Sequence, residues 1–177
     1  MTVLNFYFDM DGTLCEWKPT KDLSVLYMPG YFLNLRPQEN VVKLLTDLLD
    51  AGYKVSVLSA VLGPQQEAEK RIWLGRVFGE RRPEIPAIFV PCGGNKSKYV
   101  SVSSETILID DHSPNLVQWV NAGGNGIKVL NGFNGSGKNW KGERIDSAAP
   151  ILVSEVIRKS VSCASDSAAK PFVVATV

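Results

Sequence analysis

The sequence predicts an α/β domain with a parallel sheet flanked by helices. Short apolar runs rich in Val, Ile and Leu alternate with longer segments whose apolar residues recur at helical spacing, which is typical of repeated βα units. The length of 177 residues suits one domain with a sizeable core. We therefore expect a single domain over residues 1–158, followed by a flexible tail, 159–177, that is rich in small residues.

The first half of the chain is expected to supply two strands and two helices. The first strand covers Val3–Phe8. Residues Glu16–Arg36 contain prolines, a glycine and aromatic residues without a clean period, so they predict a small irregular cap inserted after this strand. A helix then begins at Pro37 and ends at Ala51-Gly52, where the glycine can adopt the left-handed conformation. A second strand, Tyr53–Leu58, and a helix, Pro64–Phe78, follow.

The second half is expected to supply three more strands and two helices. The strands are Ile85–Val90, Thr106–Ile109 and Gly126–Leu130. The helices are Ser113–Ala122 and a segment from Ile151 through Arg158. All the strands are short and apolar, as expected for strands buried in a parallel sheet.

The composition is that of an ordinary globular protein. It has 45% hydrophobic residues, 21% charged residues and a formal net charge of +1, so no basic surface for a nucleic-acid polymer is expected. Three widely spaced cysteines without a CxxC pair argue against a disulfide framework or a zinc site, and they favour a reducing compartment. Because neither a leader pattern nor an apolar run of membrane-spanning length is present, we expect a cytoplasmic protein without membrane insertion.

Two carboxylates follow the first predicted strand, in the run Asp9-Met10-Asp11-Gly12-Thr13. In an open parallel sheet, ligands bind just beyond the carboxyl ends of the strands. Asp9 can bind a cation and attack phosphorus, while Asp11, redirected by the Gly12 turn, can reach the leaving-group oxygen and exchange a proton with it. The alternative is a solvated Asp-Gly turn that caps the strand.

Polar side chains also follow other predicted strands. Ser59 follows the second strand and can donate to a phosphate oxygen, although capping a turn or helix is the alternative. Asp110-Asp111 follows the fourth strand, and mutual repulsion between the two acids favours a hard cation such as Mg²⁺, with a surface turn as the alternative. The loop before that strand carries Lys96 and Lys98, either of which could neutralise phosphate and keep a nearby carboxylate ionised.

The order Asp-x-Asp, Ser, Lys, Asp-Asp resembles the four motifs of the haloacid dehalogenase (HAD) superfamily of phosphotransferases, over roughly residues 3–130. The resemblance implies the Rossmann-like HAD fold, and it favours Lys96 over Lys98 because Asn95-Lys96-Ser97 fits the family pattern better. Two segments, Glu69–Gly79 and Leu35-Arg36-Pro37, are also similar to the 5′(3′)-deoxyribonucleotidase family.

The resemblance further implies a two-step phosphoryl transfer. Asp9 attacks the phosphomonoester to form an aspartyl-phosphate, which water then hydrolyses. Asp11 protonates the departing alkoxide and later deprotonates the water, while Ser59 and Lys96 bind the phosphate. The implied Mg²⁺ ligands are Asp9, the backbone carbonyl of Asp11, and one or both of Asp110 and Asp111.

The side chains that contact the substrate are less clearly marked. Lys70 is a further candidate for a phosphate contact, or else a solvated helix charge paired with Glu67 or Glu69. In the insertion, Tyr27 and the pair Tyr31-Phe32 could stack on a nucleobase, or could pack the cap onto the core. The insertion is shorter than in the nucleotidase relatives, which leaves the nucleobase pocket undefined.

Two other patterns do not predict a site. Residues 132–138 fit the phosphate-binding pattern GxxxxGK, but Asn139 replaces the required Ser or Thr and Trp140 does not begin an apolar-periodic helix, so a loop is expected. His112, the sole histidine, follows the acidic pair, and a role at the start of a helix or in hydrogen bonding is expected because Asp11 already serves as acid and base.

The sequence therefore predicts a Mg²⁺-dependent phosphomonoesterase for small molecules, with nucleoside monophosphates as the expected substrates. One alternative is a phosphatase for another small phosphorylated metabolite. Another is a non-catalytic relative that binds a nucleotide or a partner protein, although a binding module would not need Asp11. The preferred base and sugar, the 5′ or 3′ position of the phosphate and the oligomeric state are left open.

Overall fold

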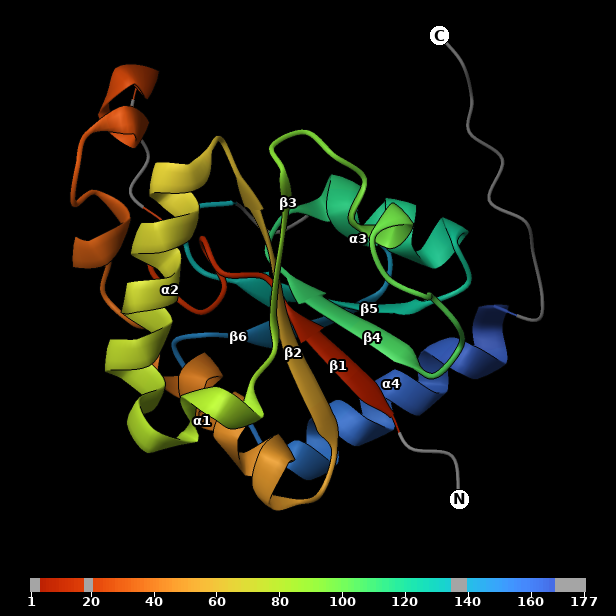
Figure 1. Cartoon of the computed structure of the whole chain (residues 1–177). Coiled ribbons are helices and arrows are strands. Elements are labelled where there is room, and N and C mark those ends of the chain that lie inside the picture. Colours follow the sequence, from red (N-terminus) through yellow and green to blue (C-terminus); the bar gives the residue numbers. More distant parts are fainter. Residues whose placement is uncertain (1–3, 18–20, 135–139, 168–177) are drawn as a thin grey trace, which may run out of the picture.

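The computed structural model describes residues 4–17, 21–134 and 140–167, and its centre is one six-stranded parallel sheet (Figure 1). The strands lie in the order β3-β2-β1-β4-β5-β6, and every neighbouring pair is parallel. Their bounds are Asn5–Phe8 (β1), Lys54–Val61 (β2), Ala87–Pro91 (β3), Thr106–Asp110 (β4), Asn125–Leu130 (β5) and Glu143–Asp146 (β6). The predicted α/β fold with a parallel sheet is thus confirmed.

The strand order places the point where the winding direction reverses between β1 and β4. The chain builds outward from β1 to β3 on one side and then returns to build from β4 to β6 on the other. Phe8 in β1 is level with Val57 in β2 and Ile109 in β4, and the Asp9 N–H donates to the Ile109 carbonyl at 2.9 Å. The residues that follow β1 and β4 therefore meet at the crevice where ligands bind in such sheets.

Within the described ranges, four α-helices cover the sheet. Their bounds are Glu39–Asp50 (α1), Pro64–Phe78 (α2), Ser113–Asn121 (α3) and Val153–Ser167 (α4). Side chains of α1, α2 and α4 pack with Phe6, Phe8 and Ile109 in one apolar cluster, whereas Leu116 and Trp119 of α3 belong to a second. Figure 1 shows α3 on the other side of the sheet from α1 and α4. The core therefore consists of two layers, one on each face of the sheet.

The insertion after β1 is irregular, as predicted. Within it the structure describes two 3₁₀ helices, Leu23–Tyr27 (η1) and Phe32–Asn34 (η2). The two ends of the insertion pair at an isolated β-bridge between Cys15 and Pro37, beside which the Glu16 N–H donates to the Arg36 carbonyl at 2.8 Å. The insertion runs beside α2 (Figure 1), where the buried Glu69 carboxylate accepts hydrogen bonds from the N–H groups of Gly30 and Phe32 at 2.7 and 3.1 Å.

Two features at the C-terminal end of the described chain differ from the expectations. The strand β6 was not predicted, because its sequence Glu-Arg-Ile-Asp contains one apolar residue, and that residue is the one buried. Helix α4 continues to Ser167, past the predicted end of the helix at Arg158, while the flexibility expected of the tail stays a prediction. Here the Lys159 ammonium pairs with the Glu143 carboxylate of β6 at 2.9 Å. Residues 168–177 lie outside the described part of the chain.

The bounds of α2 and the glycine that follows α1 confirm two further expectations. Helix α2 has the predicted bounds, and Gly52 has a φ of 84° just after α1. Cys15 and Cys92 are free thiols, while the side chain of Cys163 lies outside the described residues. In the described ranges, no helix has both the length and the apolar character needed to cross a membrane.

Candidate active site

The turn after β1 is held by its own backbone. The N–H groups of Thr13, Leu14 and Cys15 all donate to the Met10 carbonyl, at 3.2, 2.9 and 3.0 Å. Gly12 has a φ of 81°, and a Cβ atom at this position would lie 2.1 Å from Oδ2 of Asp111. Glycine is therefore required here both for the backbone conformation and for the close approach of the carboxylate.

Three buried carboxylates meet at the carboxyl ends of β1 and β4. Oxygen atoms of Asp9, Asp110 and Asp111 lie within 4.8 Å of one another. Burial raises the pKa of Asp9 to about 7, with Lys96 opposing the shift and Asp110 adding to it. Burial also raises the pKa of Asp111 to about 8, and Asp110 and Asp9 raise it further. A cluster of hard oxygen donors with excess negative charge fits a divalent cation such as Mg²⁺.

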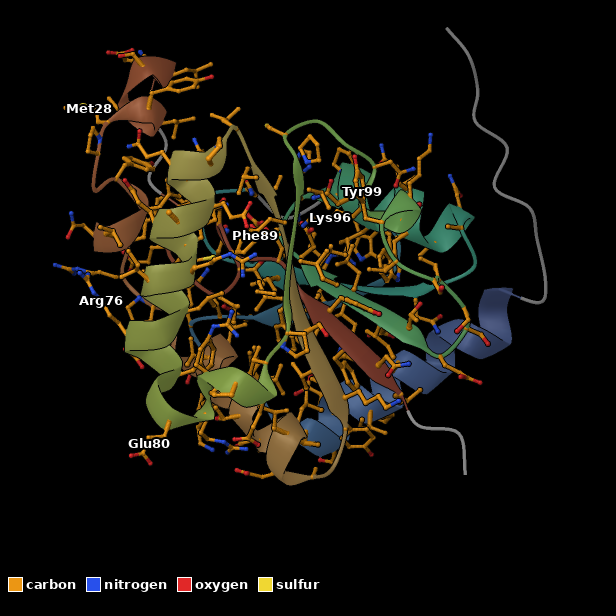
Figure 2. The ribbon with its side chains drawn as sticks, viewed as in Figure 1. Met28, Arg76, Glu80, Phe89, Lys96 and Tyr99 are labelled. Atoms are coloured by element: carbon orange, nitrogen blue, oxygen red, sulfur yellow. The ribbon has the colours of Figure 1, made fainter. Side chains whose placement is uncertain are left out.

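Lys96 lies among these acids. Its ammonium donates to Asp9 Oδ1 at 2.5 Å and to Asp110 Oδ2 at 2.7 Å, and the side chain is buried. Figure 2 labels Lys96. Burial lowers the pKa of Lys96, but the carboxylates of Asp110 and Asp9 outweigh burial and raise it. Lys98, the competing candidate, is exposed at the end of the 3₁₀ turn Lys96–Lys98 (η4). The structure therefore places Lys96, rather than Lys98, at the carboxylates.

Lys70 of α2 is fully buried at the same edge of the sheet. Its Nζ atom donates to Asp11 Oδ2 at 2.5 Å, to Ser59 Oγ at 3.0 Å and to the carbonyl of Ala60 at 2.6 Å. Ser59 is also buried and lies within β2 rather than after its end. The structure thus brings Asp11, Ser59 and Lys70 together in one cluster.

The alternative interpretation of Lys70, a solvated charge paired with Glu67 or Glu69, is wrong. Glu67 pairs with Arg71 at 2.7 Å on the exposed side of α2, and Glu69 is occupied by backbone N–H groups of the insertion. Because a buried ammonium must have polar partners, those of Lys70 come from the site itself.

The aromatic residues of the insertion differ in position. Phe32 is 3% exposed, belongs to the core cluster and lies 4.9 Å from Nζ of Lys70, so the expectation that it stacks on a nucleobase is not supported. Tyr31 is half-buried and packs edge-on against Phe32, with ring centroids 5.0 Å apart. Burial raises the pKa of Tyr31, and Asp11 raises it further. Tyr27 is 62% exposed. Of these three residues, Tyr31 is the half-buried one whose pKa Asp11 raises.

The two patterns that were set aside behave as expected where they are described. His112 is exposed and precedes α3, and its backbone N–H donates to Asp110 Oδ1 at 2.7 Å. Residues 135–138 of the GxxxxGK segment, and residue 139 after it, lie outside the described chain. Trp140, which follows them, is buried and leads to β6 rather than to a helix.

The sequence reasoning missed several amide side chains around the acids. Asn115 donates to Asp110 Oδ2 at 2.9 Å. Asn131 donates to Asp111 Oδ2 at 2.8 Å, Asn134 contacts the same oxygen, and Gln38 donates to the Gly12 carbonyl at 2.7 Å. Asn131 follows β5 directly, so applying the strand-end rule to this strand would have found it.

A cavity of about 320 Å³ lies beside the amides Gln38 and Asn131. It is lined by residues that border the insertion, begin α1, or follow β5 and β6: Glu16, Pro37, Gln38, Glu39, Asn131, Phe133, Ser147 and Ala148. The cavity therefore combines two carboxylates, two amides and an aromatic ring that is 53% exposed. These groups can accept hydrogen bonds from hydroxyl groups and pack against an apolar face.

Comparison with known proteins identifies the fold. No protein-family model and no curated protein matches the sequence. Among solved structures, D,D-heptose 1,7-bisphosphate phosphatase from Burkholderia thailandensis has a TM-score of 0.58 at 14% identity, over 81% of this chain and 90% of that one. The corresponding enzyme of B. bronchiseptica, complexed with magnesium and phosphate, has a TM-score of 0.57 at 13% identity, over 88% and 99%.

A HAD-superfamily hydrolase from Ehrlichia chaffeensis has a TM-score of 0.54 at 11% identity, over 93% of this chain and 99% of that one. At these identities the likeness establishes the fold. The chain therefore has the same Rossmann-like α/β fold as these three structures, with a parallel sheet flanked by helices, as expected from the sequence.

Proposed function

We propose that this chain is a Mg²⁺-dependent phosphomonoesterase that works through an aspartyl-phosphate on Asp9. The observation that carries the proposal is the meeting of two clusters at one sheet edge, the three carboxylates with Lys96 and the group Asp11, Ser59 and Lys70. The first supplies a nucleophile and cation ligands, and the second supplies an acid and phosphate donors.

The first step is transfer of the phosphoryl group to Asp9. A carboxylate oxygen of Asp9 forms a bond to phosphorus as the bond to the leaving-group oxygen breaks, and Asp11 gives its proton to that oxygen. In the second step Asp11 takes a proton from water, whose oxygen attacks phosphorus and releases phosphate from Asp9. Ser59 and Lys96 bind the phosphate oxygens, and Lys70 contributes charge beside Asp11.

The residues that would hold Mg²⁺ are Asp9, the Asp11 carbonyl, and one or both of Asp110 and Asp111. The cation supplies neutralisation of the crowded carboxylates and of the phosphoryl oxygens. The donor set consists of hard oxygens, which suits this ion.

The first substrate class we propose is the nucleoside monophosphates. The two segments that resemble the deoxyribonucleotidase family contact one another, because the indole N–H of Trp73 in α2 donates to the Leu35 carbonyl at 2.7 Å. Tyr31 lies in the insertion beside these segments, its pKa is raised by Asp11, and its half-exposed aromatic ring can stack on a base.

A second candidate class, sugar phosphates, is favoured by the cavity beside Gln38. The carboxylates of Glu16 and Glu39 can accept hydrogen bonds from a hydroxyl-rich leaving group, and the ring of Phe133 can pack against its C–H face. The names of two structural neighbours, a heptose bisphosphate phosphatase and β-phosphoglucomutase from Clostridium difficile, are consistent with this class.

The test is phosphate release from a panel of nucleoside monophosphates, sugar phosphates and p-nitrophenyl phosphate, each with Mg²⁺ and with EDTA. Preference for nucleotides supports the first class, and Tyr31→Ala should then raise their KM about tenfold, in line with the loss of one stacking contact. Turnover of sugar phosphates alone supports the second class, and Glu39→Gln should then raise their KM. Nucleotide binding without turnover identifies the non-catalytic alternative.

A further inference from the structure

The amide of Asn131 connects three strand ends. Asn131 follows β5, and its Nδ2 atom donates to the Gly12 carbonyl in the turn after β1 at 2.8 Å and to Asp111 Oδ2 after β4 at 2.8 Å. Gly12 and Asp111 are the two residues whose close approach requires a glycine. One side chain therefore fixes the distance between the nucleophile turn and the acidic pair.

Asn131 is itself held in place on its other side. Its Oδ1 atom accepts the N–H groups of Phe133 and Asn134, at 3.0 and 3.1 Å. The amide thus uses both hydrogens and its oxygen at once, so its orientation is defined by the loop that follows β5. A neutral side chain with four partners in fixed directions is suited to orienting other groups rather than to acting as an acid, a base or a nucleophile.

The two ends of this bridge each have a second amide donor. Gln38 also donates to the Gly12 carbonyl, at 2.7 Å, and Asn134 also contacts Asp111 Oδ2. With Oδ2 held by two amides, the remaining oxygen of Asp111 has a single long contact, 3.5 Å from the Thr13 hydroxyl. The amides therefore leave Oδ1 as the Asp111 oxygen with the most capacity for another ligand.

We propose that Asn131 is the positioning residue of the cation site: it orients Asp111 and locks the Gly12 turn, so that the ligands are arranged before the cation arrives. This inference rests on the proposed Mg²⁺ dependence. Outer partners that orient metal ligands commonly contribute 10–100-fold to metal affinity. Asn131 contacts both the Asp111 carboxylate and the turn that carries the Asp11 carbonyl, whereas Gln38 and Asn134 each contact one of them.

These shared contacts provide matched variants. Asn131→Ala removes both contacts, Gln38→Ala removes only the one to Gly12, and Asn134→Ala removes only the one to Asp111. The Mg²⁺ dissociation constant of each metal-free protein is measured by titration calorimetry, and the thermal midpoint is measured in EDTA. We expect Asn131→Ala to weaken Mg²⁺ binding by about 10–100-fold, and each single-contact variant by about threefold to tenfold, with midpoints in EDTA that do not follow this order.

The possible outcomes separate this inference from the proposed function. If the wild-type protein binds no Mg²⁺, both fail. If the wild-type protein binds Mg²⁺ and Asn131→Ala binds it equally well, the positioning role is wrong and the proposed function stands. Affinities that decline in proportion to the EDTA midpoints also overturn the inference, since they indicate a structural role alone. If Asn131→Ala does not fold, Asn134→Ala decides: unchanged affinity in that variant contradicts the role of the amides on Asp111.

Discussion

Two buried lysines pair with three of the four acids of the site. Lys96 contacts Asp9 and Asp110, and Lys70 contacts Asp11, with all three N–O distances between 2.5 and 2.7 Å. Burying an ammonium or a carboxylate is costly unless it is paired. The proposed nucleophile and the proposed acid thus have separate cationic partners.

The Lys70 ammonium can be tested by substitution. Lys70→Ala removes the cation from Asp11 and a donor from Ser59, so we expect kcat/KM to fall by about 10²–10³-fold, the usual effect of losing a charged donor in a site. Arg71→Ala is the matched control, because Arg71 lies next to Lys70 on α2 and pairs with Glu67 at the surface. Steady-state kinetics of both variants provide the measurement. A loss of less than about threefold in Lys70→Ala would assign Lys70 a packing role.

At the level of single residues, the sequence located the charges but not all their partners. The spacing of Asp9, Asp11 and Asp110 relative to apolar runs was sufficient to place them at one sheet edge. The partner of Lys70 could not be predicted, because Glu67 and Glu69 are close to it in sequence and only the fold shows that both are engaged elsewhere. Asn131 carries no charge, and its position directly after β5 was the one signal in the sequence that could have marked it.

Side chains of helix α2 attach the insertion to that helix through hydrogen bonds. Glu69 binds the backbone of η2, Gln66 donates to the Leu26 carbonyl at 3.0 Å, and Trp73 donates to the Leu35 carbonyl. Each of these three side chains is buried. Since α2 also carries Lys70, the insertion is attached to the element that reaches into the site.

Glu69 attaches the insertion to α2 through the backbone N–H groups of Gly30 and Phe32. Its carboxylate accepts two backbone N–H groups in a buried position, and hydrogen bonds to charged groups contribute about 1.5–3 kcal/mol each. We expect Glu69→Ala to lower the free energy of unfolding by about 2–4 kcal/mol and to raise KM. Denaturant unfolding measures the first effect. Glu67→Ala, at the surface of the same helix, should cost less than about 1 kcal/mol, and equal losses in both variants would contradict this account.

At the level of elements, apolar periodicity predicted the buried strands and the helices. Helix α2 was found with its bounds because a proline begins it and a glycine follows it. Strand β6 was missed because an edge strand with one buried side chain has no periodic signal. The insertion was recognised as irregular, but its attachment to α2 depends on hydrogen bonds between residues far apart in sequence.

At the scale of the whole molecule, the strand order concentrates negative charge at one edge of a nearly neutral protein. The formal net charge is +1, yet three buried carboxylates meet where β1 and β4 end. The three carboxylates repel one another in the folded chain, and a divalent cation bound among them would reduce this repulsion.

This charge predicts how stability depends on pH. The pKa values of Asp9 and Asp111 are raised from 3.8 to about 7 and about 8. At pH values between the ordinary pKa and the raised ones, the folded protein therefore holds protons that the unfolded chain has released. The stability of the metal-free protein must then fall as pH rises through this window. Lys96 does not contribute, because its raised pKa keeps it protonated throughout.

We expect the thermal midpoint in EDTA to be lower at about pH 8.5 than at about pH 5.5, and Mg²⁺ to raise the midpoint more at the higher pH. Differential scanning calorimetry at both pH values tests this prediction. Asp111→Asn is the control, because it removes one of the two titrating groups and should flatten the pH dependence. A larger Mg²⁺ effect at acidic pH would contradict the charge assignment.

The central claim, that Asp9 is the nucleophile of a Mg²⁺-dependent phosphomonoesterase, is tested most directly by the turnover rate of Asp9→Asn. The rate is measured with Mg²⁺ on the best substrate of the panel, beside the wild-type protein and with the thermal midpoint as a check of folding. The account predicts a fall of at least about 10³-fold, because an amide oxygen does not replace the attacking carboxylate. A folded Asp9→Asn variant that retains turnover near the wild-type rate would contradict it.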